Sequence, residues 1–157
     1  MRPCTPMDIP SLTRLTADTG MFRASEVEVL DEVLADYFSE NAAAGHRCEV
    51  LQPSGEAVLG YVYYAPAAMT DRTWYLYWIA VDVARQGGGI GARMLAHVEA
   101  SIRTERGRVL FIETSSLPVY EPTRRFYLKN GYVIDGQLRD FYADGDDMVV
   151  FRKHLQG

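Results

Sequence analysis

Three consecutive glycines, Gly87–Gly89, and a fourth at Gly91 lie between an apolar segment and an amphipathic one. The preceding segment, Trp74–Val81, is rich in aromatic and β-branched residues, which is typical of a buried strand. The following segment carries apolar residues at helical spacing, at positions 90, 94, 98 and 102, which predicts a helix to about Glu105. A glycine cluster that opens a helix presents unpaired backbone amides to a ligand. The pattern therefore predicts a phosphate-binding loop.

The rest of the chain alternates between helix-like and strand-like segments without a linker or a repeat. Helices are predicted from about Asp8 to Gly20, and from a capping box at Ser25–Glu28 to about Asn41. Strands are predicted at residues 47–51, 57–64, 74–81, 109–114, 132–134 and 148–155, with another helix at 121–130. The nearly continuous apolar run Val109–Thr114 is typical of a strand in a parallel pair. We therefore expect a single α/β domain over residues 1–157, with a mixed sheet.

Two familiar phosphate-binding loops fit these residues poorly. A Walker A loop requires Gly-Lys-Ser/Thr, but the first lysine of the chain is Lys129. The spacing of Gly87, Gly89 and Ala92 matches a dinucleotide fingerprint formally, and Glu113 ends the next strand. However, residues 82–86 separate the first glycine from its strand, and too few strands follow to complete a doubly wound sheet. A nicotinamide-binding enzyme is therefore the weaker alternative.

The sequence from Trp74 to Tyr132 resembles the GNAT superfamily of N-acetyltransferases. Arg85-Gln86-Gly87-Gly88-Gly89-Ile90-Gly91 is similar to the acyl-CoA loop Q/R-x-x-G-x-G/A of that family. Arg124–Tyr132 looks like its second signature, R-x-F-Y-x-x-x-G-F/Y. The resemblance implies an α+β fold with a mixed, mostly antiparallel sheet, a central splayed pair of parallel strands, and helices on both faces.

The resemblance also implies how acetyl-CoA, the cosubstrate, is bound. The two parallel strands would separate at their carboxyl ends, so that the pantetheine arm adds to the exposed backbone of the first strand. The amides of the glycine loop would hold the pyrophosphate, and Arg85 would assist with its charge or remain a solvated loop residue. The expected cofactor-binding residues are Ile79, Ala80, Val81, Arg85, Gln86, Gly87, Gly88, Gly89, Ile90, Gly91 and Ala92.

Transfer of an acetyl group to an amine requires a neutral nucleophile and protonation of the departing thiolate. Tyr127 matches the tyrosine that donates this proton in many members of the family, although a packed aromatic residue is the structural alternative. Glu113 is the first candidate for the general base and Asp82 the second. Tyr75 and Tyr77 alternate on one face of their strand, where they would line an acceptor tunnel or simply pack.

The charge and the cysteine content of the chain limit which partners it can bind and in which compartment it is expected. The 16 Lys and Arg residues against 21 Asp and Glu residues leave a net charge of -5, which disfavours nucleic acid and anionic membranes as partners. No apolar stretch is long enough to span a membrane, and no signal peptide is recognisable. Cys4 and Cys48 form no disulfide framework, so we expect reduced thiols and a cytoplasmic protein. It would be a monomer or a homodimer.

No metal site is expected. The three histidines, His46, His97 and His154, are scattered along the chain, and the two cysteines lack metal-ligand spacing. The acidic residues around Gly145 lack the full calcium-loop pattern and are interpreted as a hairpin turn.

The function predicted from the sequence is direct acetyl transfer from acetyl-CoA to the amine of a small molecule or peptide. No cysteine adjoins the glycine loop or Tyr127 to serve as a covalent nucleophile. The alternative is a CoA-sensing or partner-binding module with the same fold and no turnover. The identity of the acceptor cannot be read from the residues.

Overall fold

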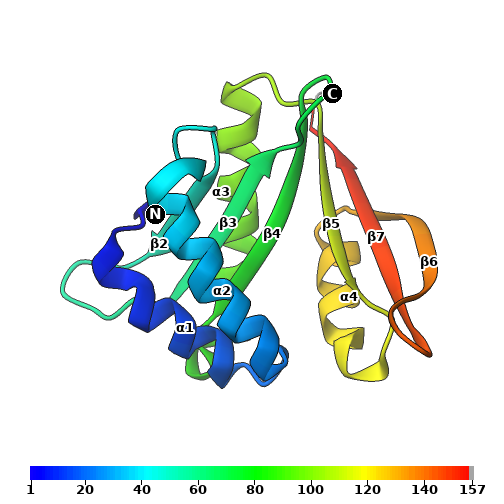
Figure 1. Cartoon of the computed structure of the whole chain (residues 1–157), viewed down its shortest axis with the longest axis horizontal. Helices are drawn as coiled ribbons and strands as arrows, with labels where there is room; N and C mark the ends of the chain where they lie inside the picture. The colour runs from blue at the N-terminus through cyan, green and yellow to red at the C-terminus, as the bar shows by residue number, and fades with distance from the viewer. Residues whose placement is uncertain (156–157) are drawn as a thin grey trace.

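A computed structural model describes residues 1–155. Its seven strands form one sheet in the order β1-β2-β3-β4-β5-β7-β6 (Figure 1). Every neighbouring pair is antiparallel except β4 and β5, which are parallel. The strands are β1 (Arg2–Pro3), β2 (Arg47–Leu51), β3 (Gly60–Pro66), β4 (Thr73–Val81), β5 (Val109–Ser115), β6 (Val133–Ala143) and β7 (Asp146–His154). The expected mixed sheet with one parallel pair is confirmed.

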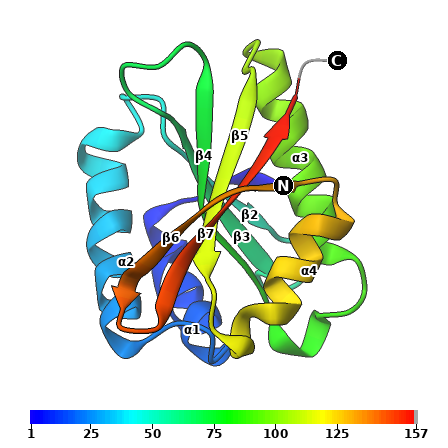
Figure 2. The same ribbon diagram turned by 90° about the vertical axis from the view of Figure 1, so that its right-hand side faces the viewer.

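Four α-helices cover the two faces of this sheet. They are α1 (Ile9–Asp18), α2 (Ala24–Asp36), α3 (Ile90–Thr104) and α4 (Glu121–Lys129). Figure 2 shows α1 and α2 on one side of the strands, with α3 and α4 on the other. Among residues 1–155, none of the helices is long and apolar enough to cross a membrane.

Each face of the sheet has its own apolar core. The larger core joins α3 and α4 to the sheet and includes Leu76, Met94, Ile112, Tyr127 and Phe151. The smaller core lies beneath α1 and α2 and includes Leu12, Leu30, Leu34, Tyr61 and Ala80. Because side chains alternate between the faces of a strand, neighbouring residues of β4 and β5 belong to different environments.

The parallel pairing of β4 with β5 is short. It begins at Thr73 with Val109 and ends at Leu76 with Ile112, although both strands continue beyond these residues. In the antiparallel pairing with β3, Tyr64 faces Leu76 while Tyr63 faces Trp78. Tyr77 is therefore an extra residue in β4, and such a bulge bends the strand that contains it. We call the region beyond the last parallel pair the fork.

The helix and strand boundaries correct the sequence expectations at several points. Helix α2 begins at Ala24, before the predicted Ser25–Glu28 capping box. The backbone N–H of Arg23 donates to Glu26 Oε2 at 2.6 Å, so Glu26 makes the reciprocal contact instead of Glu28. Strand β3 begins at Gly60 rather than residue 57. The helix predicted at 121–130 is confirmed, and Gly131 follows it with a left-handed φ of 84°.

The C-terminal strands are longer than expected. Residues 132–134 were predicted as a short strand, whereas β6 continues to Ala143 and pairs with β7. The prediction stopped early because β6 is an edge strand whose residues are almost all exposed, so it lacks the apolar alternation of a half-buried strand. The acidic residues around Gly145 do form the turn of this hairpin.

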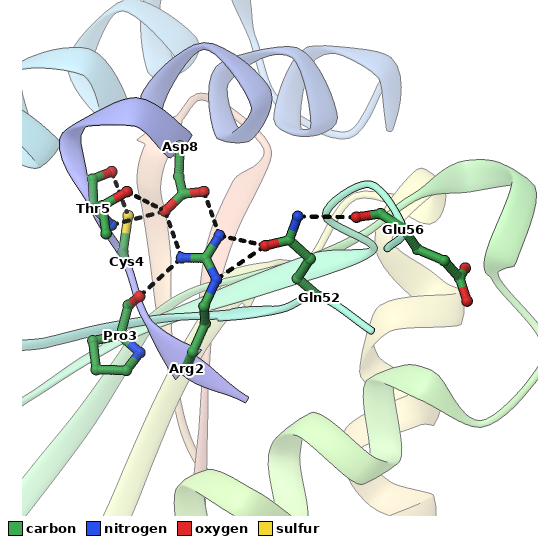
Figure 3. A network of polar contacts seen from close by, with 7 residues as sticks. All are labelled: Arg2, Pro3, Cys4, Thr5, Asp8, Gln52 and Glu56. Carbon is green, nitrogen blue, oxygen red and sulfur yellow. Dashed lines mark hydrogen bonds and ion pairs between the residues drawn. The ribbon is translucent and has the colours of Figure 1, made fainter. Parts of the chain in front are cut away.

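A polar network fixes the N-terminal strand to the start of α1 (Figure 3). Two guanidinium nitrogens of Arg2 donate to the Asp8 carboxylate at 2.8 and 2.7 Å, and the Thr5 N–H donates to the same carboxylate at 2.8 Å. Arg2 also donates to Gln52 Oε1. These partners lower the pKa of Asp8 to about 2, the Arg2 hydrogen bond being the largest cause. Asp8 occupies the predicted N-cap position of α1, but its side chain accepts no hydrogen bond from α1 and instead accepts one from the Thr5 N–H.

We predict that Asp8→Asn lowers the free energy of unfolding by about 1–2 kcal/mol at pH 7. Because the pKa of Asp8 is lower in the folded than in the unfolded protein, its ionised form stabilises the fold at pH values above the unfolded-state pKa. This stabilisation is lost as the pH falls toward the folded-state pKa. The difference between variant and wild type should therefore shrink between pH 4 and pH 2, to about half at pH 3. Urea unfolding at several pH values measures this, with the exposed Asp18→Asn as control. A difference independent of pH would contradict the role given to the Arg2–Asp8 pair.

Candidate active site

The glycine loop presents a series of unpaired backbone amides. Gly87 and Gly89 have φ values of 80° and 76°, and Gly89 caps the N-terminus of α3. The first hydrogen bond of the helix runs from Arg93 N–H to the Gly89 carbonyl at 3.0 Å. Among the described residues, the six N–H groups from Gly87 to Ala92 have no acceptor. These donors and the partial positive charge of the helix N-terminus form a site suited to a phosphate.

Gly91 has a packing role in addition to its place in the motif. A Cβ atom at this position would lie 3.4 Å from the Phe126 ring, which belongs to α4. By contrast, Cβ atoms at Gly87 and Gly89 would meet nothing within 4 Å. The two loop glycines are therefore required by their left-handed φ, whereas Gly91 permits α3 and α4 to approach each other.

The exposed edge of β4 lies next to this loop. Ile79, Ala80 and Val81 pair with β3 on one side and have no pairing with β5 on the other. This arrangement leaves a strand edge available for an added strand. The Gln86 side-chain amide already donates to the Val81 carbonyl at 3.2 Å. Arg85 is exposed, and its guanidinium lies 3.5 Å from Glu56.

Tyr127 lies in the larger core, with only 4% of its surface exposed. Its ring centroid is 5.3 Å from that of Phe151 and 5.9 Å from that of Tyr132. Burial raises the pKa of the Tyr127 hydroxyl above its ordinary value, so the group stays protonated at neutral pH. The structure thus supports the packing role of Tyr127 and keeps it in the form required of a proton donor.

Glu113 lies at the fork, in a pocket of about 130 Å³. The pocket is lined by Tyr75, Leu76, Tyr77, Glu113 and Tyr142. Although Glu113 is exposed, its surroundings partly desolvate the carboxyl and raise its pKa above the ordinary value. Its negative charge contributes to raising the pKa of Tyr75, Tyr77 and Tyr142. Among residues 1–155, Glu113 has no ion-pair or hydrogen-bond partner for its side chain.

Glu113 and Tyr127 face opposite sides of the sheet. Ile112 belongs to the same core as Tyr127, and by strand alternation Glu113 points to the other face. The two predicted catalytic residues thus lie on opposite faces of the sheet. Beyond Leu76 and Ile112, β4 and β5 are not paired with each other.

Asp82, the second candidate base, has a structural explanation. It precedes a short 3-10 helix, Val83–Arg85, and its carboxylate accepts a hydrogen bond from the Ala84 N–H at 2.9 Å. No group of three or more His, Cys, Asp or Glu side chains within residues 1–155 is arranged to hold a metal ion.

Sequence reasoning missed one residue of the pocket, Tyr142. It lies near the end of β6, beyond the point where the predicted strand stopped. Burial is the largest cause that raises the pKa of Tyr142 to about 12, followed by the charge of Glu113. Only the hairpin register brings Tyr142 to the fork, so no local pattern in the sequence could have identified it.

Comparisons with known proteins agree with this geometry. A family model described as Acetyltransferase (GNAT) domain matches residues 44–134, which is more than half of the chain. A solved structure described as a GNAT-family acetyltransferase from Desulfovibrio desulfuricans is 35% identical, covers 99% of this chain and 98% of its own, and superposes with a TM-score of 0.93. No curated protein matched the sequence.

More distant structures share the fold. An aminoglycoside 6'-N-acetyltransferase complexed with coenzyme A is 18% identical, with a TM-score of 0.75 over 98% of this chain and 93% of that one. The ribosomal-protein-S18-alanine N-acetyltransferase from Escherichia coli is 16% identical, with a TM-score of 0.77 over 99% and 92%. Taken with the family model and the 35% identical structure, the fold and its loop place this chain in the GNAT family of acetyltransferases.

Proposed function

We propose that residues 1–157 act as a single acetyl-CoA-dependent N-acetyltransferase domain. The observation that carries this proposal is the position of the fork beside six unpaired amides at the start of α3. The fork offers a strand edge for an extended arm, and the loop offers donors for a pyrophosphate. A cytoplasmic location, a monomeric or homodimeric state and the absence of a metal requirement stay predictions from the sequence.

The residues available fit acetyl-CoA. The amides from Gly87 to Ala92 would hold the pyrophosphate, with Arg85 free to assist because its contact with Glu56 is long and exposed. The pantetheine arm would pair with Ile79, Ala80 and Val81, and Gln86 would release the Val81 carbonyl. Acetyl-CoA, when bound, supplies an acyl group on a thiol leaving group.

Two side chains would manage the protons of the transfer. The amine nitrogen of the acceptor forms a bond to the acyl carbon, and the bond from that carbon to sulfur breaks. Glu113 takes the proton that the nitrogen loses, and Tyr127 gives a proton to the departing sulfur and recovers one from solvent. Cys4 and Cys48 are both buried and do not line the pocket: Cys4 follows β1, and Cys48 belongs to β2, which β3 separates from β4. The proposal therefore uses direct transfer.

The alternative is a module that binds CoA without turnover. Both functions predict that acetyl-CoA raises the melting temperature of the protein. Only the enzyme releases free thiol from acetyl-CoA when a panel of amines is supplied. Thermal protection without thiol release from any amine would favour the binding module.

We predict that Gly88→Asp weakens CoA binding at least tenfold, which corresponds to about 1.4 kcal/mol. A Cβ at Gly88 has no contact closer than 3.7 Å, so the change adds a negative charge among the loop amides without a clash. Gly88→Asn is the control because it has the same shape without the charge, and it should bind within about threefold of wild type. Calorimetry measures both, and equal affinities for the two variants would contradict the loop assignment.

We predict that Tyr127→Phe lowers kcat about a hundredfold and leaves the affinity for CoA nearly unchanged. The substitution removes only the hydroxyl, so the ring contacts with Phe151 and Tyr132 persist. Steady-state thiol release and a melting curve measure the two effects. A variant that turns over like wild type at every pH would show that Tyr127 is only a core residue.

We predict that activity falls as pH decreases through the pKa of Glu113, which partial desolvation raises above its ordinary value. The base must be ionised to accept a proton, so activity is lost below that pKa and present above it. Glu113→Gln should lower kcat/KM about a hundredfold and abolish this acidic limb. The pH–activity curve should also rise as the acceptor amine loses its proton, near pH 10 for an alkylamine, and this rise should remain in both proteins. An unchanged acidic limb in the variant would assign it to another group.

A further inference from the structure

The pocket at the fork is small and lies on the face of the sheet opposite the larger core. Tyr75 and Tyr77 reach it from β4, Glu113 from β5 and Tyr142 from β6. Its volume of about 130 Å³ is well below the roughly 300 Å³ at which typical ligand pockets begin. The pocket therefore accommodates the reacting end of an acceptor, such as a nitrogen with one or two methylene groups.

The charge in and around this pocket is negative. Among the described residues, Glu113 is the only charged lining residue, and no Lys, Arg or His lines the pocket. Arg23 and Arg152 are each paired with a carboxylate, Arg23 with Asp146 at 3.1 Å and Arg152 with Asp135 at 2.7 Å. A ligand with its own carboxylate next to the amine would be placed against Glu113 without a compensating cation among the lining residues.

The aromatic lining adds a second feature that favours a cation. The rings of Tyr75 and Tyr77 are stacked with centroids 5.8 Å apart, and Phe111 continues the array 5.7 Å from Tyr75. Tyr77 is 53% exposed, so much of its surface remains accessible to a ligand. Aromatic faces attract ammonium groups, and they do so more strongly where water is partly excluded.

We propose that this pocket binds the acceptor as a primary ammonium group on an unbranched alkyl carbon, with Glu113 and the three tyrosines as its recognition residues. This inference rests on the proposed function and specifies the class of its substrate. The carboxylate of a free amino acid disfavours its binding. Any other α-amine is disfavoured because the carbon next to its nitrogen carries a branch. Tyr142 is thereby a specificity-determining residue that acts through its ring.

Three amines that share one carbon chain test the proposal. n-Pentylamine has an unbranched carbon next to nitrogen, norleucine amide adds a neutral branch, and norleucine adds a charged one. Binding to the wild-type protein at pH 6.5, where all three are ammonium ions, is followed by NMR titration. We expect n-pentylamine to bind at least tenfold more tightly than norleucine, with norleucine amide between them. Equal affinities for the three would overturn the proposal.

Variants at Tyr142 test the contribution of its ring. Tyr142→Phe keeps an aromatic face and should bind n-pentylamine within about twofold of wild type. Tyr142→Leu should weaken binding about threefold or more. The affinity for CoA, measured by calorimetry, should be the same in both variants, which shows that the fold and the glycine loop are intact. Identical amine affinities for the Phe and Leu variants would overturn the role of the ring.

Acetylation assays separate this proposal from the function on which it rests. Both assays use saturating acetyl-CoA. Nα-acetyl-lysine amide represents a protein lysine, and 1,4-diaminobutane represents a free polyamine. The better substrate of the two indicates whether the natural acceptor is a protein or a polyamine. If n-pentylamine binds selectively but no amine is acetylated, the enzyme function fails and the pocket assignment stands. If norleucine is acetylated as efficiently as n-pentylamine, the enzyme function stands and the pocket assignment fails.

Discussion

One extra residue in β4 is the constraint on which the site depends. The bulge at Tyr77 immediately follows the last parallel pair, Leu76 with Ile112, so β4 bends where its pairing with β5 ends. Both strands are still held on their outer sides, β4 by β3 and β5 by β7. Only the hydrogen bonds between β4 and β5 are lost at the fork. The backbone N–H and C=O groups that would have formed them are available to a ligand that pairs like a strand.

The same interruption connects the two faces of the sheet. In a continuous sheet, Glu113 and Tyr127 would be separated by paired backbone, because they belong to opposite faces. The proposed proton acceptor and proton donor therefore require a ligand that passes between β4 and β5, where these strands are not paired with each other. The long β6–β7 hairpin brings Tyr142 to the pocket on the Glu113 face.

Local patterns in the sequence predicted most of the helices and strands and the glycine loop. The apolar run of β5, the stripe of α3 and the glycines before it are features of neighbouring residues, so they can be read without the fold. The bulge at Tyr77 could not be predicted, because it depends on the register with β3. Tyr142 was missed because β6 is exposed along its length and its apolar residues do not alternate regularly with polar ones. The packing role of Gly91 required knowing that Phe126 lies opposite it.

The glycine loop and the pocket lie at two ends of the fork and carry potentials of opposite sign, and each sign has its own physical cause. At the glycine loop, positive potential comes from backbone amides and the α3 dipole, which depend on conformation and change little with pH. At the pocket, negative potential comes from one carboxylate, that of Glu113, whose pKa is raised by partial desolvation. An anionic cosubstrate and a cationic acceptor would thus be drawn to separate ends, and their reactive groups would meet where β4 and β5 part. The net charge of -5 does not oppose this arrangement, because the proposed phosphate site relies on backbone amides rather than on an excess of lysine or arginine.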